Sequence, residues 1–219
     1  MKKTLLLLAC VLFGFIIAEK AYAQNTVTSI RERYADIKKR IELMSEEGGW
    51  PPEYYQVNVF QNLPATGPHK EDVRMYYDEV KTEEDEIYPP HRLSFATCRY
   101  NFAPRIFYEE YLYDEDGKPA FIYARNPDIE FGIDYDFRFY FNKEKLIKVV
   151  IKCRPGEDSD PRLLQKNWDA SAPTDGEGWC EVYSGTRLPK EYESLKDSYL
   201  NSAKKHLKLF DAVDSSTHL

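Results

Sequence analysis

Near the start of the chain, apolar residues recur every three or four positions, which is the spacing of one face of an α-helix. The stripe consists of Ile30, Tyr34, Ile37, Ile41 and Met44. Ser29 with Glu32 three residues later forms a capping box at the start of this helix. The pair Gly48-Gly49 supplies a stop signal. We therefore predict an amphipathic helix whose apolar face needs a packing partner.

Between residues 54 and 153 the period changes to two, the pattern of half-buried β-strands. Tyr55, Val57 and Val59 alternate with polar residues, and the same alternation recurs at Val73, Met75, Tyr77, Leu93 and Phe95. Successive strands joined by short links favour antiparallel pairing between neighbours. The pattern predicts an antiparallel meander of about seven strands.

Two hairpins are the clearest part of this meander. One joins residues 105–113 to residues 120–125 through a polar turn, in which Gly117 supplies the positive φ of a tight reversal. The other joins residues 135–141 to residues 146–153.

Residues 154–179 form the least regular segment, with three prolines and three glycines, and a loop of this length is usually functional or mobile. A second helix opens at Pro189, with an apolar stripe of Leu195, Tyr199, Ala203, Leu207 and Phe210. The order helix, sheet, helix predicts an α+β domain with both helices packed on one sheet face.

The other sheet face is expected to be aromatic. Its alternate positions carry Tyr54, Phe60, Tyr76, Tyr100, Tyr123 and Tyr140, beside Arg74, Arg125 and Arg138. Tyrosine suits surfaces that meet a protein or a sugar, because its ring is apolar and its tip forms hydrogen bonds. The competing interpretation is structural, since antiparallel strands favour aromatic residues and cross-strand aromatic pairs stabilise a solvated face. On the binding hypothesis, Tyr76, Tyr123 and Tyr140 contact the ligand.

The first 23 residues have the order of a secretory signal peptide. Lys2 and Lys3 precede an uncharged apolar run, and small residues stand before a predicted cleavage between Ala23 and Gln24. Two alternatives remain open: a retained anchor, and a lipoprotein attached through Cys10. The chain then divides into a signal peptide (1–23), one domain (24–210) and a polar tail (211–219). We expect a periplasmic or secreted protein with no membrane span after cleavage.

The net charge of the chain bears on which partners it can bind. The chain has 219 residues, with 30 Lys and Arg against 37 Asp and Glu, and a formal charge of −7. Without residues 1–23 the balance is 27 against 36, a charge of −9. This charge argues against a broad electrostatic contact with nucleic acid, which needs clustered basic residues.

Three cysteines follow the predicted cleavage site. We expect a disulfide between Cys153, which ends a strand, and Cys180, which follows the long loop, with Cys98 buried on its strand. The alternative is that all three are reduced and buried. No CxxC spacing is present, so the sequence predicts no zinc or thioredoxin-like site.

Motifs for catalysis are absent: there is no HExxH, GxSxG, GxGxxG or P-loop. His91 and Arg92 follow two prolines at a strand entrance and form a candidate anion site, although the simpler interpretation is a partly exposed strand end. Carboxylates within or beside strands, which a glycosidase mechanism needs in pairs, are Glu109, Glu110, Asp134 and Asp136.

These observations favour an exported, non-enzymatic binding domain that uses the aromatic sheet face or the 154–179 loop to bind a protein or a glycan. No catalytic residue, metal ligand or cofactor is assigned. One alternative is a secreted hydrolase acting on carbohydrate through paired carboxylates. A further alternative is a periplasmic inhibitor or accessory subunit whose loop fills the cleft of a partner.

Overall fold

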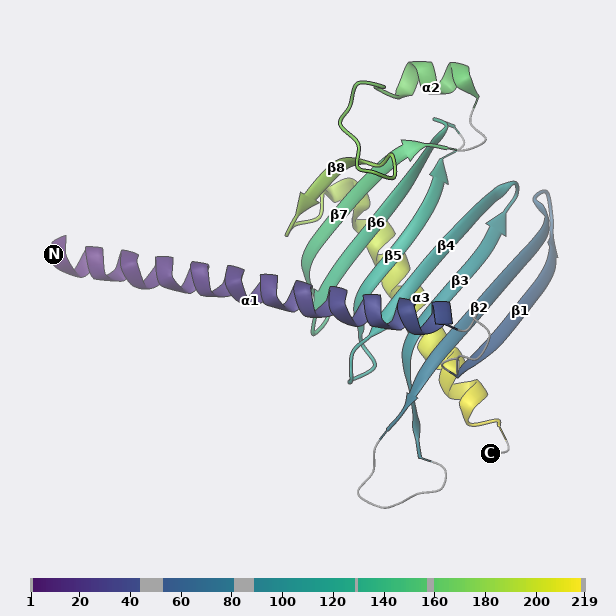
Figure 1. The fold of residues 1–219 in the computed structure, drawn as a ribbon, viewed down its shortest axis with the longest axis horizontal. Helices are drawn as coiled ribbons and strands as arrows, with labels where there is room; N and C mark the ends of the chain where they lie inside the picture. Colours follow the sequence, from purple (N-terminus) through teal and green to yellow (C-terminus); the bar gives the residue numbers. More distant parts are fainter. Residues whose placement is uncertain (1, 44–52, 81–88, 129, 157–159, 218–219) are drawn as a thin grey trace.

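A computed structural model describes residues 2–43, 53–80, 89–128, 130–156 and 160–217, without the side chains of residues 2–22 (Figure 1). It contains a long N-terminal helix, α1 (Lys2–Leu43), a short helix α2 (Pro161–Asn167), a single 3-10 turn (Lys190–Tyr192) and a C-terminal helix, α3 (Glu193–Asp214). Within these residues, no helix combines the length and apolar character needed to cross a membrane. The predicted glycine stop after α1 lies outside the described residues.

Eight strands form one antiparallel sheet in sequence order, so the predicted meander is confirmed with one more strand at its edge. The strands are β1 (Tyr54–Leu63), β2 (Gly67–Glu79), β3 (His91–Phe102), β4 (Arg105–Tyr113), β5 (Pro119–Asp128), β6 (Ile133–Asn142), β7 (Lys145–Pro155) and β8 (Cys180–Gly185).

Both predicted hairpins form, and local chemistry explains their turns. In the β4–β5 turn, Asp114 accepts hydrogen bonds from the backbone N–H of Asp116 (3.0 Å) and of Lys118 (2.8 Å), and Gly117 has a φ of 71°. In the β6–β7 turn, Lys143 and Glu144 both have positive φ, as a two-residue hairpin turn requires.

The α+β class is confirmed, but the two helices lie on opposite sheet faces rather than on one (Figure 1). The face under α3 carries the larger cluster, which includes Met75, Ile122 and Phe139. The face under α1 carries Phe95, Phe121 and Tyr140 among its buried residues. The sequence-based assignment differed because it treated the tyrosine-rich face as solvated. The rings of Phe95, Phe121 and Tyr140 are buried in the structure, so that face also needs a covering helix.

The predicted apolar stripe of α1 makes this cover. Val27, Ile30 and Ile37 are buried, and the ring of Tyr34 meets those of Phe95 and Phe121 edge-on, at centroid distances of 6.0 and 5.0 Å. Edge-on contacts of this kind stabilise a pair of aromatic rings by more than the burial of their apolar surface alone. The described packing of α1 therefore comes from the part that follows the predicted cleavage site.

Helix α3 packs through its predicted stripe: Tyr199, Ala203 and Phe210 are buried, and Leu195 and Leu207 are partly buried against the same cluster. It continues to Asp214, so the first residues of the predicted tail belong to the helix. The 154–179 segment also contains structure, because α2 lies within it and Trp179 is buried under the guanidinium of Arg154, 4.5 Å from the ring centroid.

We predict that Ile37→Ala lowers the free energy of unfolding by about 2–4 kcal/mol, because it leaves a cavity between α1 and the sheet. Lys39→Ala is the matched control, since Lys39 is exposed on the same helix. Urea denaturation of both variants checks this, and equal stability of the two would show that α1 does not pack on the sheet.

Candidate functional site

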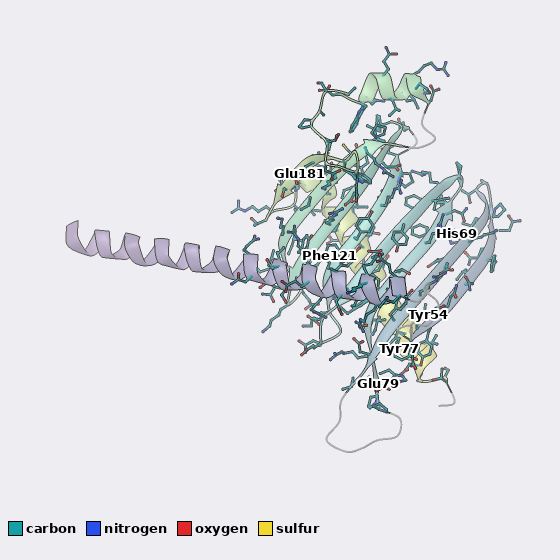
Figure 2. The ribbon with its side chains drawn as sticks, in the orientation of Figure 1. Tyr54, His69, Tyr77, Glu79, Phe121 and Glu181 are labelled. Atoms are coloured by element: carbon teal, nitrogen blue, oxygen red, sulfur yellow. The ribbon has the colours of Figure 1, made fainter. Side chains whose placement is uncertain are left out.

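A pocket of about 490 Å³ lies where α1 crosses the sheet. The helix contributes Ile30, Arg31, Tyr34 and Lys38 to its lining. Strands β4, β5 and β6 contribute Tyr108, Glu110, Phe121, Tyr123, Arg138 and Tyr140. Figure 2 shows Phe121, one of these lining residues, in the middle of the sheet at this crossing. The pocket thus combines aromatic rings with charged groups of both signs.

Glu110 is the centre of the polar contacts in this pocket, and it is only 1% exposed. Its Oε1 accepts hydrogen bonds from the Tyr108 hydroxyl (2.6 Å) and from Lys38 Nζ (2.8 Å). Its Oε2 accepts a hydrogen bond from the Tyr34 hydroxyl. A buried carboxylate needs such partners, because an unpaired charge is costly to remove from water. Two of the three donors come from α1, so the same contacts hold the helix on the sheet.

The tyrosines around Glu110 remain hydrogen-bond donors at neutral pH. Burial, and after it the charge of Glu110, raises the pKa of Tyr34 and of Tyr108 well above the usual value. Burial raises the pKa of Tyr123 to about 12, and the charges of Asp136 and Glu110 act in the same direction. The pocket therefore offers neutral hydroxyl groups and no phenolate.

Cationic groups outnumber carboxylates in the lining. Arg138 donates to both oxygens of the buried Asp136, at 3.0 and 2.8 Å, and its guanidinium lies 5.8 Å from the Tyr123 ring centroid. Burial raises the pKa of Asp136, and Arg138 partly offsets this. Arg31 lies over the Tyr140 ring at 5.5 Å and donates to its hydroxyl at 3.3 Å. Lys38 is paired with Glu110 and Arg138 with Asp136, so Arg31 is the one cation of the lining that no carboxylate of the described residues neutralises.

The structure brings two of the three predicted aromatic binding residues into this pocket. Tyr123 and Tyr140 line it, although Tyr140 is only 3% exposed. Tyr76 is also 3% exposed and packs against Phe95 and the Tyr54 ring, outside the lining. The predicted aromatic face is present except for Tyr100, which shares the face of Cys98 two residues earlier and lies under α3. Helix α1 covers the aromatic face and leaves a pocket instead of an open surface.

The structure does not add His91 and Arg92 to this site. His91 Nδ1 lies 2.7 Å from Asp214 Oδ1, an oxygen that also accepts a hydrogen bond from the Tyr55 hydroxyl at 2.8 Å. His91 therefore joins the sheet to the end of α3. Arg92 stands opposite Asp78 in the β2–β3 pairing.

The four candidate carboxylates divide between the two faces. Glu109 lies on the α3 side, where it accepts hydrogen bonds from Tyr100 (2.9 Å) and Tyr111. Glu110, next to it in the strand, points to the opposite face and into the pocket. On the pocket side, Asp134 is paired with Arg125 at 2.6 Å and Asp136 with Arg138.

The cysteines occupy positions that bear on the predicted disulfide. Cys153 and Cys180 stand directly opposite each other in the β7–β8 pairing, and both are free thiols in the structure. Cys98 is buried in the core cluster under α3, as its sequence position predicted.

Several site residues carried no functional signal in the sequence. Tyr34 belonged to a predicted packing stripe, and Lys38, four residues later, has the spacing that places it on the same side of the helix. Tyr108 and Glu110 are two residues apart on a strand and so share a face. These periodicities identify neighbours on each element, but not which helix face meets which strand face.

Comparisons of the chain with protein-family models, with curated proteins and with solved structures give no match.

We predict a coupling of about 1–3 kcal/mol between Lys38 and Glu110 in a double-mutant cycle of Lys38→Met and Glu110→Gln, because Glu110 is buried and charge-assisted hydrogen bonds are strong there. Lys118 and Glu144, an exposed pair 3.4 Å apart, provide the control cycle, for which we expect about 0.2–1 kcal/mol. Chemical denaturation of each variant measures both couplings. A Lys38–Glu110 coupling no larger than the control would show that this contact does not hold α1 in place.

Proposed function

We propose that this protein is an exported, non-enzymatic binding domain whose pocket between α1 and the sheet takes a carbohydrate bearing an acidic group. The observation that carries the proposal is one pocket of about 490 Å³ whose lining combines tyrosine rings with more cationic than anionic side chains. This volume is within the usual range of small-molecule sites.

The aromatic lining supports a sugar as the ligand. Tyr108 and Tyr123 are half-buried, so each presents part of its ring to the pocket. Tyrosine offers an apolar face to the C–H groups of a sugar ring and a hydroxyl group to its polar edge. Lys38 adds a donor at the same position, because its ammonium group has three hydrogens and Glu110 accepts one of them.

The charge of the lining supports an acidic sugar over a neutral one. Lys38 and Arg138 already have carboxylate partners, whereas Arg31 makes no ion pair among the described residues. Arg31 is exposed at the pocket, and a guanidinium binds a carboxylate through two parallel hydrogen bonds. A carboxylate or sulfate on the ligand would therefore find a cation that is not yet neutralised.

Binding is favoured over hydrolysis because the pocket carboxylates are already occupied. Both oxygens of Glu110 accept hydrogen bonds, and Arg138 contacts both oxygens of Asp136. A glycosidase needs one carboxyl group that is free to donate a proton and a second that is free to attack or to activate water. The inhibitor alternative would use the 154–179 segment, in which Trp179 is buried but helix α2 has no buried residue.

An array of neutral and acidic oligosaccharides, probed with the labelled protein, tests the ligand class. We expect binding to acidic spots, and a loss of affinity of about tenfold or more in Tyr123→Ala and in Arg31→Ala, since each removes one direct contact. Phe60→Ala is the control, because Phe60 is 73% exposed on β1 and does not line the pocket.

Circular dichroism spectra show whether each variant is folded, and Arg31→Ala removes an exposed side chain together with its contacts to Tyr140. Capture of no oligosaccharide by the wild-type protein contradicts the proposal, as does equal affinity in all three variants. Release of a shorter sugar during incubation would favour the hydrolase instead.

Export and a Cys153–Cys180 disulfide belong to the same proposal. Directly opposed residues in antiparallel strands have Cα atoms about 4.5–5.5 Å apart, which is within the range that a disulfide bridges. The register of β7 and β8 places the two thiols in this relation. The described packing of α1 begins at Val27, after the predicted cleavage between Ala23 and Gln24, so removal of the leader leaves that packing in place.

We predict that protein recovered from the exported fraction contains a Cys153–Cys180 disulfide, while Cys98 stays a free thiol because it is buried. Mass spectrometry of a non-reduced digest identifies the linked peptide. Closing a loop of about 28 residues should raise the free energy of unfolding by about 3–4 kcal/mol over the reduced form. Full alkylation of Cys153 and Cys180 without a reductant would contradict both the bridge and an oxidising location.

A further inference from the structure

Three side chains from distant parts of the chain converge under α3, on the sheet face opposite the proposed sugar pocket. They are Glu71 on β2, Cys98 on β3 and His206 on α3. One carboxylate oxygen, the thiol sulfur and one ring nitrogen all lie within 4.8 Å of one another. We infer that this cluster is a binding site for a divalent metal ion of the zinc class.

The distance between two of these atoms already suits a bound zinc ion. Cys98 Sγ lies 3.6 Å from Glu71 Oε1. In a tetrahedral zinc site with ordinary Zn–S and Zn–O bonds, the sulfur and oxygen ligands stand about 3.5 Å apart. One ring nitrogen of His206 lies within 4.8 Å of both atoms and supplies the third ligand.

His206 provides a second, independent observation. The residue is 6% exposed, and its Nδ1 has no hydrogen-bond partner among the described residues. An unpaired buried nitrogen is costly, so a native protein usually gives it a partner.

His69 lies beside the cluster, at the other carboxylate oxygen of Glu71, and is not one of the three converging residues. Its Nδ1 lies 2.6 Å from the backbone oxygen of Asn101, and because a carbonyl only accepts, this nitrogen carries the hydrogen. The remaining nitrogen, Nε2, lies 3.6 Å from Glu71 Oε2. His69 is therefore placed to orient the Glu71 carboxylate, as residues outside the ligand shell of a metal commonly do.

The chemistry of this donor set favours zinc over magnesium or calcium. Thiolate and imidazole are ligands for zinc and related transition metals, whereas magnesium and calcium prefer oxygen. Binding would transfer the thiol proton of Cys98 to solvent, and the dication would balance the thiolate and the Glu71 carboxylate. Glu109, nearby on the same face, is not needed, because both its oxygens accept tyrosine hydrogen bonds.

The site would serve to fix α3 to β2 and β3, since each of these elements contributes a ligand. Glu71 has a side chain that is 32% exposed, so the ion has a route from solvent. Figure 2 labels His69 on this part of the sheet, away from Phe121 and the α1 crossing. The inference is therefore independent of the proposed sugar binding.

Titration of the chelator-treated, reduced protein with Zn²⁺ in a calorimeter tests the inference. We expect one ion per chain. The affinity for Zn²⁺ should fall about 100-fold or more in Cys98→Ser and in His206→Ala, because loss of a direct ligand weakens metal binding at least as much as loss of a residue that only orients a ligand. Cys180→Ser is the matched control and should bind as the wild type does, since Cys180 is not part of the cluster.

Cobalt substitution keeps the test decisive if either core variant fails to fold. The wild-type protein loaded with Co²⁺ should show the thiolate-to-cobalt charge-transfer band and the visible absorption of tetrahedral cobalt. Absence of stoichiometric Zn²⁺ binding would overturn the inference, and so would binding without a thiolate band. An unchanged affinity in both Cys98→Ser and His206→Ala would also overturn it.

Discussion

Each face of the sheet carries a buried apolar cluster, and this constraint determines most of the architecture. An antiparallel sheet often leaves one face to water, but here aromatic and aliphatic side chains are buried on both sides. Each face therefore needs its own helix, and the chain supplies one before the sheet and one after it. The meander between them keeps every strand next to its neighbour in sequence, so the two helices are free to cover opposite sides.

The two helices bring different residues to the sheet, and each helix forms one of the two candidate sites with the face that it covers. Helix α1 crosses a tyrosine-rich face, and the contacts of Glu110 with Tyr34 and Lys38 fix its position while leaving a pocket beside them. Helix α3 lies over the larger aliphatic and aromatic core and brings His206 to Glu71 and Cys98. On the α1 side, the buried carboxylate of Glu110 finds its partners on the helix, whereas under α3 the Nδ1 of His206 has no hydrogen-bond partner among the described residues.

Much of the fold could be predicted from the sequence, because periodicity and turn chemistry are local signals. The stripes of both helices, the hairpin turn at Gly117 and the sequential strand order all follow from them. The sides taken by the helices could not be predicted, since tyrosine suits a solvated face and a buried one equally well. Tyr123 was identified as a site residue from its face, whereas Tyr34, Lys38 and the Glu71–Cys98–His206 cluster depend on contacts between elements that are distant in sequence.

Helix α1 is part of the folded core, and it completes the pocket by closing the tyrosine face. Amide hydrogen exchange tests this arrangement most directly, because exchange reports the stability of each element separately. We expect the amides from Val27 to Ile41 to exchange as slowly as those from Tyr199 to Phe210 in α3. Exchange of the α1 amides at the rate of an unstructured peptide, with the sheet and α3 still protected, would contradict it.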